Sequence, residues 1–337
     1  MKDTYRNLFF IIGCAAVIVM LLTMDFTIED VKGALRRASY GFPALIVLWL
    51  FIYAINAYAW YIILHSGFSH AKVGFWRVYK YTITGFALNA VTPVGLMGGE
   101  PYRIMETSPY VGVEKATSSV VLYVMMHIFS HFCFWLFSVL LYFLYYFEQI
   151  NVYTAILLGI TVMVCSLGIY SFSCGYRNGL IVNLLHRLSS VPFVGKWAAR
   201  FSKEKEQQLQ EADAMIIDLH LHHKKTFYLS LFAEFMARVI SCAEVYVVLY
   251  ALGATVSYMD CILVLAFTSL FANAMFFLPL QLGAREGGFA MVINGLSFPS
   301  GYGVILGLII RLRELICVCL GLLLMKFGNR VHARKTA

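Results

Sequence analysis

Long apolar runs are the feature that most constrains how this chain can fold. A helix needs about 20 residues to cross the hydrocarbon core of a bilayer, and only helices and closed barrels satisfy their backbone hydrogen bonds there. We therefore predict an all-α, polytopic integral membrane protein with about 6–8 transmembrane helices. The runs lie at residues 8–24, 41–65, 80–97, 117–147, 152–174, 226–252, 258–282 and 301–326.

The composition indicates one membrane domain without a large soluble module. Of the 337 residues, 61% are hydrophobic and 13% are charged, and the mean hydropathy is +0.76, whereas a soluble domain has about a quarter of its residues charged. We predict a single transmembrane domain over 1–337, in which the polar stretch 175–225 is a cytoplasmic loop with a surface helix at 203–213. The net charge of +8 gathers at the ends and in this loop, which indicates membrane topology rather than nucleic-acid binding.

The positions of Lys and Arg predict which segments face the cytoplasm. Basic residues at the N-terminus, at 72–80, in the 175–225 loop and in the tail after Lys326 place both termini inside, because cytoplasmic loops carry the excess of positive charge. The links 148–151 and 253–257 hold no Lys or Arg and are expected outside.

This topology leaves two segments that cannot complete a crossing. The run 80–97 leaves the cytoplasmic side, yet the run 117–147 must start there again to reach the outer link. The run 258–282 starts outside, and the chain must return there through 286–299 before its last span. We therefore predict two re-entrant helical hairpins of opposite orientation, which is an inverted repeat.

Each predicted hairpin carries a similar motif. The first reads NAVTPVGLMGGEPYR from Asn89 to Arg103, and the second reads NAMFFLPLQLGAREGG from Asn273 to Gly288. Each passes from an Asn to a Pro and then reaches glycines beside one Glu and one Arg. Paired hydrophobic segments interrupted by Gly and Pro indicate a transporter's binding site, and charges at membrane depth are costly enough to suggest function.

The residue types in these motifs suit an anion. Glycines allow close approach of the backbone, a helix start offers free N–H groups, and an arginine presents a fork of donors for phosphate or carboxylate. The glutamates would hold the arginines in place or titrate; alternatively, each Glu–Arg pair only neutralises itself near an interface. The candidate substrate-binding residues are Asn89, Gly98, Gly99, Glu100, Arg103, Glu244, Asn273, Gly283, Arg285, Glu286, Gly287 and Arg311.

Other polar residues inside the runs are weaker candidates. Glu244 has no local partner and either lines a cavity or is a hydrogen-bonded structural group. Glu234 and Arg238 are four residues apart on one helix face and are expected to pair with each other. In the last span at least one charged residue should face the interior, towards the second hairpin; the candidates are Arg311, Arg313 and Glu314.

The sequence predicts neither a metal nor another cofactor. His127 and His131 share a helix face at a spacing that suits a metal, but no third ligand accompanies them, so we expect hydrogen-bonded histidines. Nucleotide-binding loops and familiar hydrolase motifs are absent from the sequence. We therefore expect a protein that is not an enzyme.

Several motifs resemble a known family. The runs GGEPYR at 98–103 and KATSSVV at 115–121, LYALG at 249–253 after Glu244, and LGAREGGF at 282–289 resemble the lysylphosphatidylglycerol synthase transmembrane region along essentially the whole chain. That family includes stand-alone, flippase-like membrane proteins and the flippase half of enzymes that aminoacylate phosphatidylglycerol. The chain stops at Ala337 without their soluble aminoacyl-transferase domain. The resemblance therefore implies binding or moving a lipid with an anionic headgroup, and not lysyl transfer.

We expect a lipid flippase or transporter of the bacterial inner membrane. Its hairpins would meet near the bilayer midplane, where Arg103 and Arg285 bind the phosphate of a phospholipid or of a polyprenyl-phosphate-linked glycolipid. The main alternative is a non-transporting membrane partner that anchors or regulates a separate lipid-modifying enzyme through the 175–225 loop. A third is an intramembrane enzyme that uses the buried acids. Nucleic acid is not an expected partner, and the sequence carries no signal for an oligomeric state.

Overall fold

The computed structural model shows a helical bundle. Across the part of the chain that it describes, the residues form helices and short joining turns, with no strand. This confirms the predicted all-α class. The structure describes residues 5–11, 14, 33, 41–66, 73–91, 98–178, 209–210, 213–214, 217–218, 221–274, 284–296 and 299–326.

Most of the long helices overlap the predicted apolar runs, whereas α5 and α13 lie between those runs. The runs 41–65 and 301–326 match α3 and α14 to within one residue at each end. The run 8–24 and the loop 175–225 fall mostly outside the described residues. The helices are α3 (Gly41–His65), α4 (Phe75–Val91), α5 (Gly99–Val111), α6 (Val113–Tyr145), the 3-10 turn η1 (Phe147–Gln149), α7 (Val152–Asn178), α11 (Lys224–Ala251), α12 (Tyr258–Ala274), α13 (Ala284–Gly295) and α14 (Ser300–Lys326).

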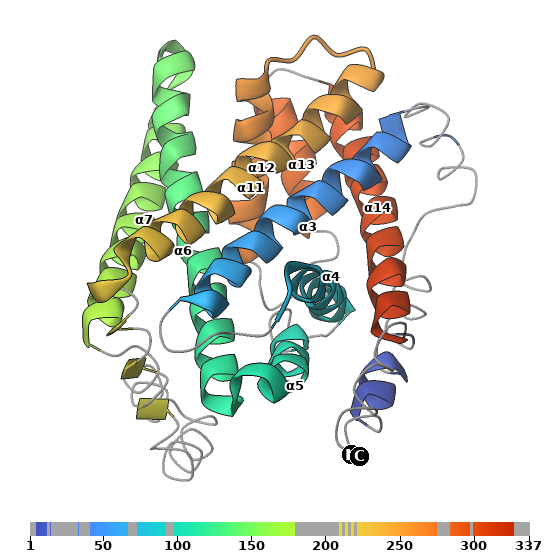
Figure 1. Ribbon diagram of the computed structural model, residues 1–337. Helices are drawn as coiled ribbons and strands as arrows, with labels where there is room; N and C mark the ends of the chain where they lie inside the picture. The colour runs from blue at the N-terminus through green and yellow to red at the C-terminus, as the bar shows by residue number, and fades with distance from the viewer. Residues whose placement is uncertain are drawn as a thin grey trace, which may run out of the picture.

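Each motif joins two of the described helices. In the first, α4 ends at Val91 and α5 begins at Gly99; in the second, α12 ends at Ala274 and α13 begins at Ala284. The predicted breaks at Pro93 and Pro279 fall in 92–97 and 275–283, which are outside the described residues. In Figure 1, α5 lies near the lower end of the bundle and α12 with α13 near the upper end.

Two units of four consecutive helices repeat the same packing. Within each unit the neighbours pack in order, α3 on α4, α4 on α5 and α5 on α6, and likewise α11 to α14. Between the units α3 packs against α11, while α4 packs on α14 and α12 on α6. A hydrogen bond supports each exchanged contact: Thr84 Oγ1 donates to the Gly321 carbonyl at 3.2 Å, and Trp135 Nε1 donates to Ser269 Oγ at 3.0 Å. Each broken helix pair thus leans on the long helix of the other unit.

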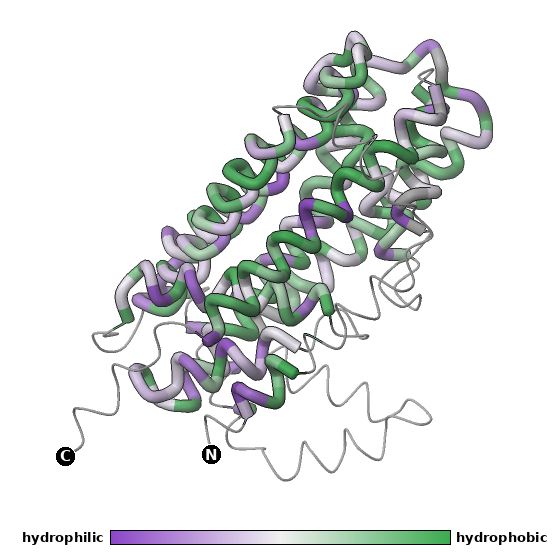
Figure 2. The backbone as a smooth tube through the Cα atoms, turned by 90° about the vertical axis from the view of Figure 1, so that its right-hand side faces the viewer, coloured by the Kyte–Doolittle hydropathy of each residue, from purple (hydrophilic) through white to green (hydrophobic). Residues whose placement is uncertain are grey.

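The long helices include several that suit a membrane. Within the described residues, α3, α6 and Val152–Cys174 of α7 are long and apolar enough to cross a bilayer. In Figure 1, α3 and α11 run diagonally between α6 and α7 on one flank and α14 on the other. Figure 2 shows hydrophilic positions inside otherwise hydrophobic helices, and α11 and α14 hold charged residues in their middle turns.

The two links predicted to share one side of the membrane lie at the same end of the bundle. The Tyr146 hydroxyl, just after α6, donates to Asp260 Oδ1 at 2.6 Å. Burial first, and then this hydrogen bond, raise the pKa of Tyr146, so its phenol remains a donor at neutral pH. Asp260 also accepts the Ser257 N–H at 2.8 Å, and the Ser257 hydroxyl accepts the Asp260 N–H at 3.2 Å, which is a capping box at the start of α12.

The predicted cytoplasmic segments gather at the other end. Lys326, at the end of α14, lies over the ring of Phe10 at 4.3 Å, and Arg6 lies 3.9 Å from Glu106 of α5. The described N-terminal residues, α5 and the end of α14 therefore share one end of the bundle. The predicted grouping of these segments on one side agrees with this arrangement.

Glycines allow the helices to approach where a side chain would collide. A Cβ on Gly99 would lie 2.2 Å from the Gly85 carbonyl oxygen, so α5 rests directly on the backbone of α4. In the second unit, a Cβ on Gly303 would lie 2.7 Å from Ala290 Cα, so α14 rests on α13 in the same way. Cβ–backbone contacts this short do not exist in folded proteins, so both positions require glycine.

Alanine at Gly303 tests this packing against a control in the same helix. Gly303→Ala should cost about 1–3 kcal/mol because α13 and α14 must separate. Gly301→Ala meets nothing within 4 Å and should be neutral or stabilising by up to about 1 kcal/mol, because alanine favours the helix. Thermal unfolding of both variants in detergent measures the difference, and equal midpoints would contradict the close contact.

Candidate functional site

The first motif is closed by Asn89, which holds the two arms of its hairpin together. Asn89 Oδ1, near the end of α4, accepts the Gly99 N–H at 2.7 Å, and Asn89 Nδ2 donates to Glu100 Oε1 at 2.9 Å. One amide therefore satisfies the first N–H of α5 and orients the carboxylate beside it. Gly98 precedes this helix start as a buried residue.

Arg103 is almost completely buried, one turn further along α5. It is 1% exposed, Nη1 donates to Glu100 Oε1 at 3.3 Å, and Nη2 donates to the Thr82 carbonyl at 3.4 Å. A Cβ on Gly85 would lie 2.3 Å from Arg103 Nε, so the guanidinium fills the groove that this glycine leaves on α4. We call Thr82, Asn89, Glu100 and Arg103 the Arg103 cluster.

Three aromatic rings surround this guanidinium. Its central carbon lies 4.9 Å from the Phe86 ring centroid, 5.1 Å from that of Tyr123 and 5.9 Å from that of Trp60. Cation–π contacts at these distances stabilise a desolvated guanidinium. Sequence reasoning missed the rings because their helices, α3, α4 and α6, meet only in the folded chain.

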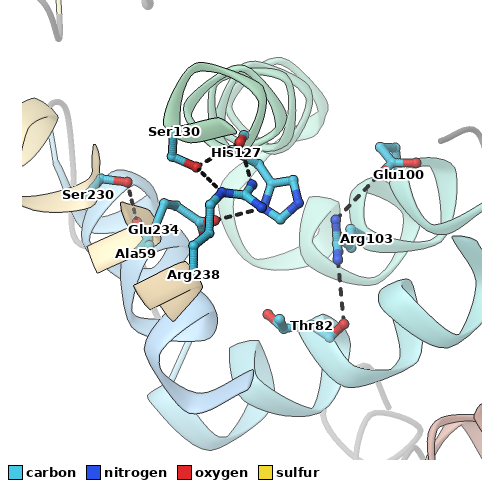
Figure 3. A network of polar contacts seen from close by, with 9 residues as sticks. All are labelled: Ala59, Thr82, Glu100, Arg103, His127, Ser130, Ser230, Glu234 and Arg238. Atoms are coloured by element: carbon cyan, nitrogen blue, oxygen red, sulfur yellow. Dashed lines mark hydrogen bonds and ion pairs between the residues drawn. The ribbon is translucent and has the colours of Figure 1, made fainter. Parts of the chain in front are cut away.

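A second polar network lies opposite the Arg103 cluster (Figure 3). Glu234 of α11 is fully buried, and its Oε2 lies 2.7 Å from His127 Nδ1 of α6. Arg238 donates from Nε to Ser130 Oγ at 2.8 Å and from Nη2 to the His127 carbonyl at 2.6 Å. The expectation that Glu234 and Arg238 pair with each other was wrong, because both extend from α11 to α6 instead.

The second motif uses its arginine differently. Arg285 of α13 donates through Nη1 to Glu314 Oε1 of α14, and Arg311 Nη1 lies 3.5 Å from Glu314 Oε2. Glu314 therefore faces the second hairpin, as predicted for one charged residue of the last span. The side chains of Arg285 and Glu314 are 32% and 22% exposed, so this group, which we call the Glu314 cluster, is more open than the Arg103 cluster.

Asn273 and Gly287 of the second motif take no part in these ion pairs. Asn273 is exposed, and its Nδ2 donates to the Ser269 carbonyl at 2.7 Å within α12. Gly287 faces open space, since a Cβ there would meet nothing within 4 Å. Gly283 and the side chain of Glu286 are outside the described part of the chain.

Glu244 is a hydrogen-bonded group in the interior, which was one of the two arrangements predicted for it. Its Oε1 and Oε2 accept from Arg313 Nε and Nη2, both at 2.8 Å, and both side chains are 3% exposed. The Arg313 guanidinium also lies 3.8 Å from the Trp49 ring centroid. All these contacts join α11, α14 and α3 in the interior.

An aromatic column separates the two groups of charges. The rings of Trp49, Tyr53 and Phe86 follow one another, with centroid distances of 5.5 Å between Trp49 and Tyr53 and 5.4 Å between Tyr53 and Phe86. The Arg313 guanidinium lies over the Trp49 ring, and the Arg103 guanidinium lies over the Phe86 ring. The structure therefore brings Asn89, Glu100 and Arg103 together, and separately gathers Arg285 and Arg311 around Glu314. Arg103 and Arg285 do not share one cluster among the described contacts.

Unsatisfied polar atoms concentrate around the Arg103 cluster. Buried polar atoms normally have a hydrogen-bond partner, from the protein, water or a ligand. Several here have none within the protein, and they come from α5, α6 and α11. They are Glu100 Oε2, Arg103 Nε, His131 Nδ1 and Glu234 Oε1. Hydrogen-bonding capacity is therefore left over on both sides of this interior.

Metal ligation finds no support in the same region. Among the residues that the structure describes, no group of three or more His, Cys, Asp or Glu side chains is placed to hold a metal ion. His127 contacts the Glu234 carboxylate of α11. The His131 ring packs edge-on against the His127 ring, with the centroids 5.5 Å apart.

The comparison with known families agrees with this architecture. Residues 10–321 match the family described as the lysylphosphatidylglycerol synthase TM region. The chain belongs to this family. The membership of the lysylphosphatidylglycerol synthase TM region and the apolar helices identify a multi-pass membrane protein. No curated protein and no solved structure gave a significant match.

The Glu244–Arg313 pair should be a strong determinant of stability. Glu244→Gln leaves a buried guanidinium without its counter-charge, which typically costs about 3–5 kcal/mol. The double variant Glu244→Leu with Arg313→Met removes both charges and should recover much of that loss. Unfolding in detergent measures both, and a double variant no more stable than the single one would show that the charges themselves are not the cause.

Proposed function

We propose that this protein moves a lipid with an anionic headgroup across the membrane, and that the Arg103 cluster binds its phosphate. It acts as a transporter rather than an enzyme. The observation that carries the proposal is a buried guanidinium with one long contact to a carboxylate: Arg103 is 1% exposed, and its Nη1 lies 3.3 Å from Glu100 Oε1. A phosphate that displaces Glu100 would accept charge-assisted hydrogen bonds from this guanidinium, and bonds of this kind are among the strongest.

The repeated packing supports a transport mechanism. Helix–break–helix units in two halves of a chain are typical of transporters, which bind their substrate where the repeats meet. Here each hairpin leans on the long helix of the other unit, so a change at one hairpin displaces a helix that the other unit contains. In the proposed orientation the hairpins are re-entrant from opposite sides, as in an inverted repeat.

The Glu314 cluster would be a second, more open station for the headgroup. Arg285 and Glu314 of this cluster are 32% and 22% exposed, whereas Arg103 is buried. A phosphate that displaces Glu314 from Arg285 would meet a guanidinium without crossing the aromatic column. The column itself, from Trp49 beside the Arg313–Glu244 pair to Phe86 beside Arg103, consists of aromatic rings.

The substrate class follows from chemistry that the two lipid types share. A phospholipid and a polyprenyl-phosphate-linked glycolipid each present a phosphate at the bilayer surface and apolar chains within it. We propose the bacterial inner membrane as the location, with both termini in the cytoplasm. The alternative of a docking partner depended on the loop 175–225, most of which lies outside the described residues.

Transport by an Arg103 variant tests this function. Arg103→Gln should lower transbilayer movement of a fluorescent phosphatidylglycerol in proteoliposomes by about 10- to 100-fold, because a charge-assisted hydrogen bond contributes about 1.5–3 kcal/mol. The matched control is Arg77→Gln, on α4 of the same hairpin. Arg77 also lies over an aromatic ring, that of Tyr110 at 5.2 Å, but it is exposed. Equal rates in both variants would rule out the proposed phosphate site.

A further inference from the structure

We propose that His127 and Glu234 form a proton-binding site that couples lipid movement to the movement of one proton. This inference rests on the proposed function and adds its energy source. It starts from the network in Figure 3, where a histidine of α6 and a carboxylate of α11 face the Arg103 cluster across the bundle interior. No residue of this pair belongs to the two glycine-rich motifs.

The contact itself holds one proton. At 2.7 Å, His127 Nδ1 and Glu234 Oε2 are joined by a hydrogen bond, whichever atom carries the hydrogen. The other carboxylate oxygen, Oε1, is buried without a partner. The His127 side chain is 25% exposed while Glu234 is fully buried. The imidazole is thus the accessible member of the pair, and its Nε2 is free to take a second proton from water.

The charges around the pair decide what that proton does. Arg103 and Arg238 carry two positive charges and Glu100 with Glu234 two negative charges, so they cancel while the imidazole is neutral. A proton on Nε2 leaves a net charge of one positive unit opposite the proposed phosphate site. The titratable and charged groups that face the pair are Glu234 and Arg238 of α11, Arg103 of α5, and Tyr123 and His131 of α6; α4 presents only the ring of Phe86.

The proton site and the phosphate site are close enough to interact. His127 and Arg103 both lie near the same two rings. The Phe86 ring centroid is 5.8 Å from that of His127 and 4.9 Å from the Arg103 guanidinium carbon, and the Tyr123 centroid is 6.4 Å and 5.1 Å from them. Proton binding should therefore strengthen the binding of an anion, and anion binding should strengthen proton binding by the same factor.

Together, a singly charged anionic headgroup and one proton are neutral. Moving a net charge through a low-dielectric interior is costly, whereas a neutralised pair avoids most of that cost. The proton enters at Nε2 from the water on one side and leaves to water on the other, and the Glu234 contact persists throughout. The site thus predicts symport of an anionic lipid with a proton, without net movement of charge.

Transport under an imposed pH gradient tests the coupling. In proteoliposomes with fluorescent phosphatidylglycerol, a difference of about one pH unit should shift the lipid distribution between leaflets by up to about tenfold, towards the alkaline side. A potassium diffusion potential without a pH gradient should leave the distribution unchanged. Glu234→Gln and His127→Gln should abolish the response to the pH gradient.

A surface histidine provides the matched control. His222 makes the same kind of contact, with Nδ1 2.8 Å from Asp218 Oδ1, but its side chain is 71% exposed. His222→Gln should retain the full response to the gradient. Two results would overturn the coupling while leaving the proposed function intact. One is wild-type transport that does not depend on the pH gradient, and the other is a response to the gradient that both Glu234→Gln and His127→Gln retain.

A spectroscopic measurement separates the two proposals if no lipid moves. Infrared difference spectra of the purified protein between acidic and neutral pH should show imidazole and carboxylate bands that disappear in Glu234→Gln and His127→Gln but persist in His222→Gln. Their presence without transport would support the proton site and contradict the proposed function. If the difference spectra of Glu234→Gln and His127→Gln are identical to those of the wild type, the proton site itself is overturned.

Discussion

A buried charge in a membrane protein must meet an opposite charge, and this requirement determines how the helices of this bundle are arranged. Arg313 reaches Glu244 with two hydrogen bonds at 2.8 Å, which fixes α14 against α11. Glu234 and Arg238 fix α11 against α6, and Glu314 holds α13 on α14. The apolar faces pack around these contacts. Because the hydrophobic effect does not draw helices together in lipid, such polar links and close glycine contacts supply much of the specificity.

The two motifs look alike in sequence but differ in what they do with their charges. In the first, Asn89, Glu100 and Arg103 bond to one another within the hairpin. In the second, Arg285 extends to Glu314 on the next helix. One motif is therefore a closed unit and the other is open to its neighbour.

Much of the architecture could be predicted because hydropathy and charge depend on neighbours along the chain. The limits of α3 and α14 and the shared end of the links at 148–151 and 253–257 followed from local patterns. The partners of single charges did not. Glu244 meets a residue 69 positions away and Glu234 one 107 positions away, and a spacing of four on one helix misled us about Arg238. The rings around Arg103 come from three helices, and sequence separation hides that arrangement.

The exchange of helices between the two units has a consequence for biosynthesis. The Thr84 hydroxyl finds its acceptor on Gly321, 237 residues later, and a Cβ on Gly321 would lie 2.4 Å from the Ala87 side chain. When α4 leaves the ribosome, the surface that will cover it has not been translated. The face of α4 that α14 covers therefore stays exposed until the last helix is inserted.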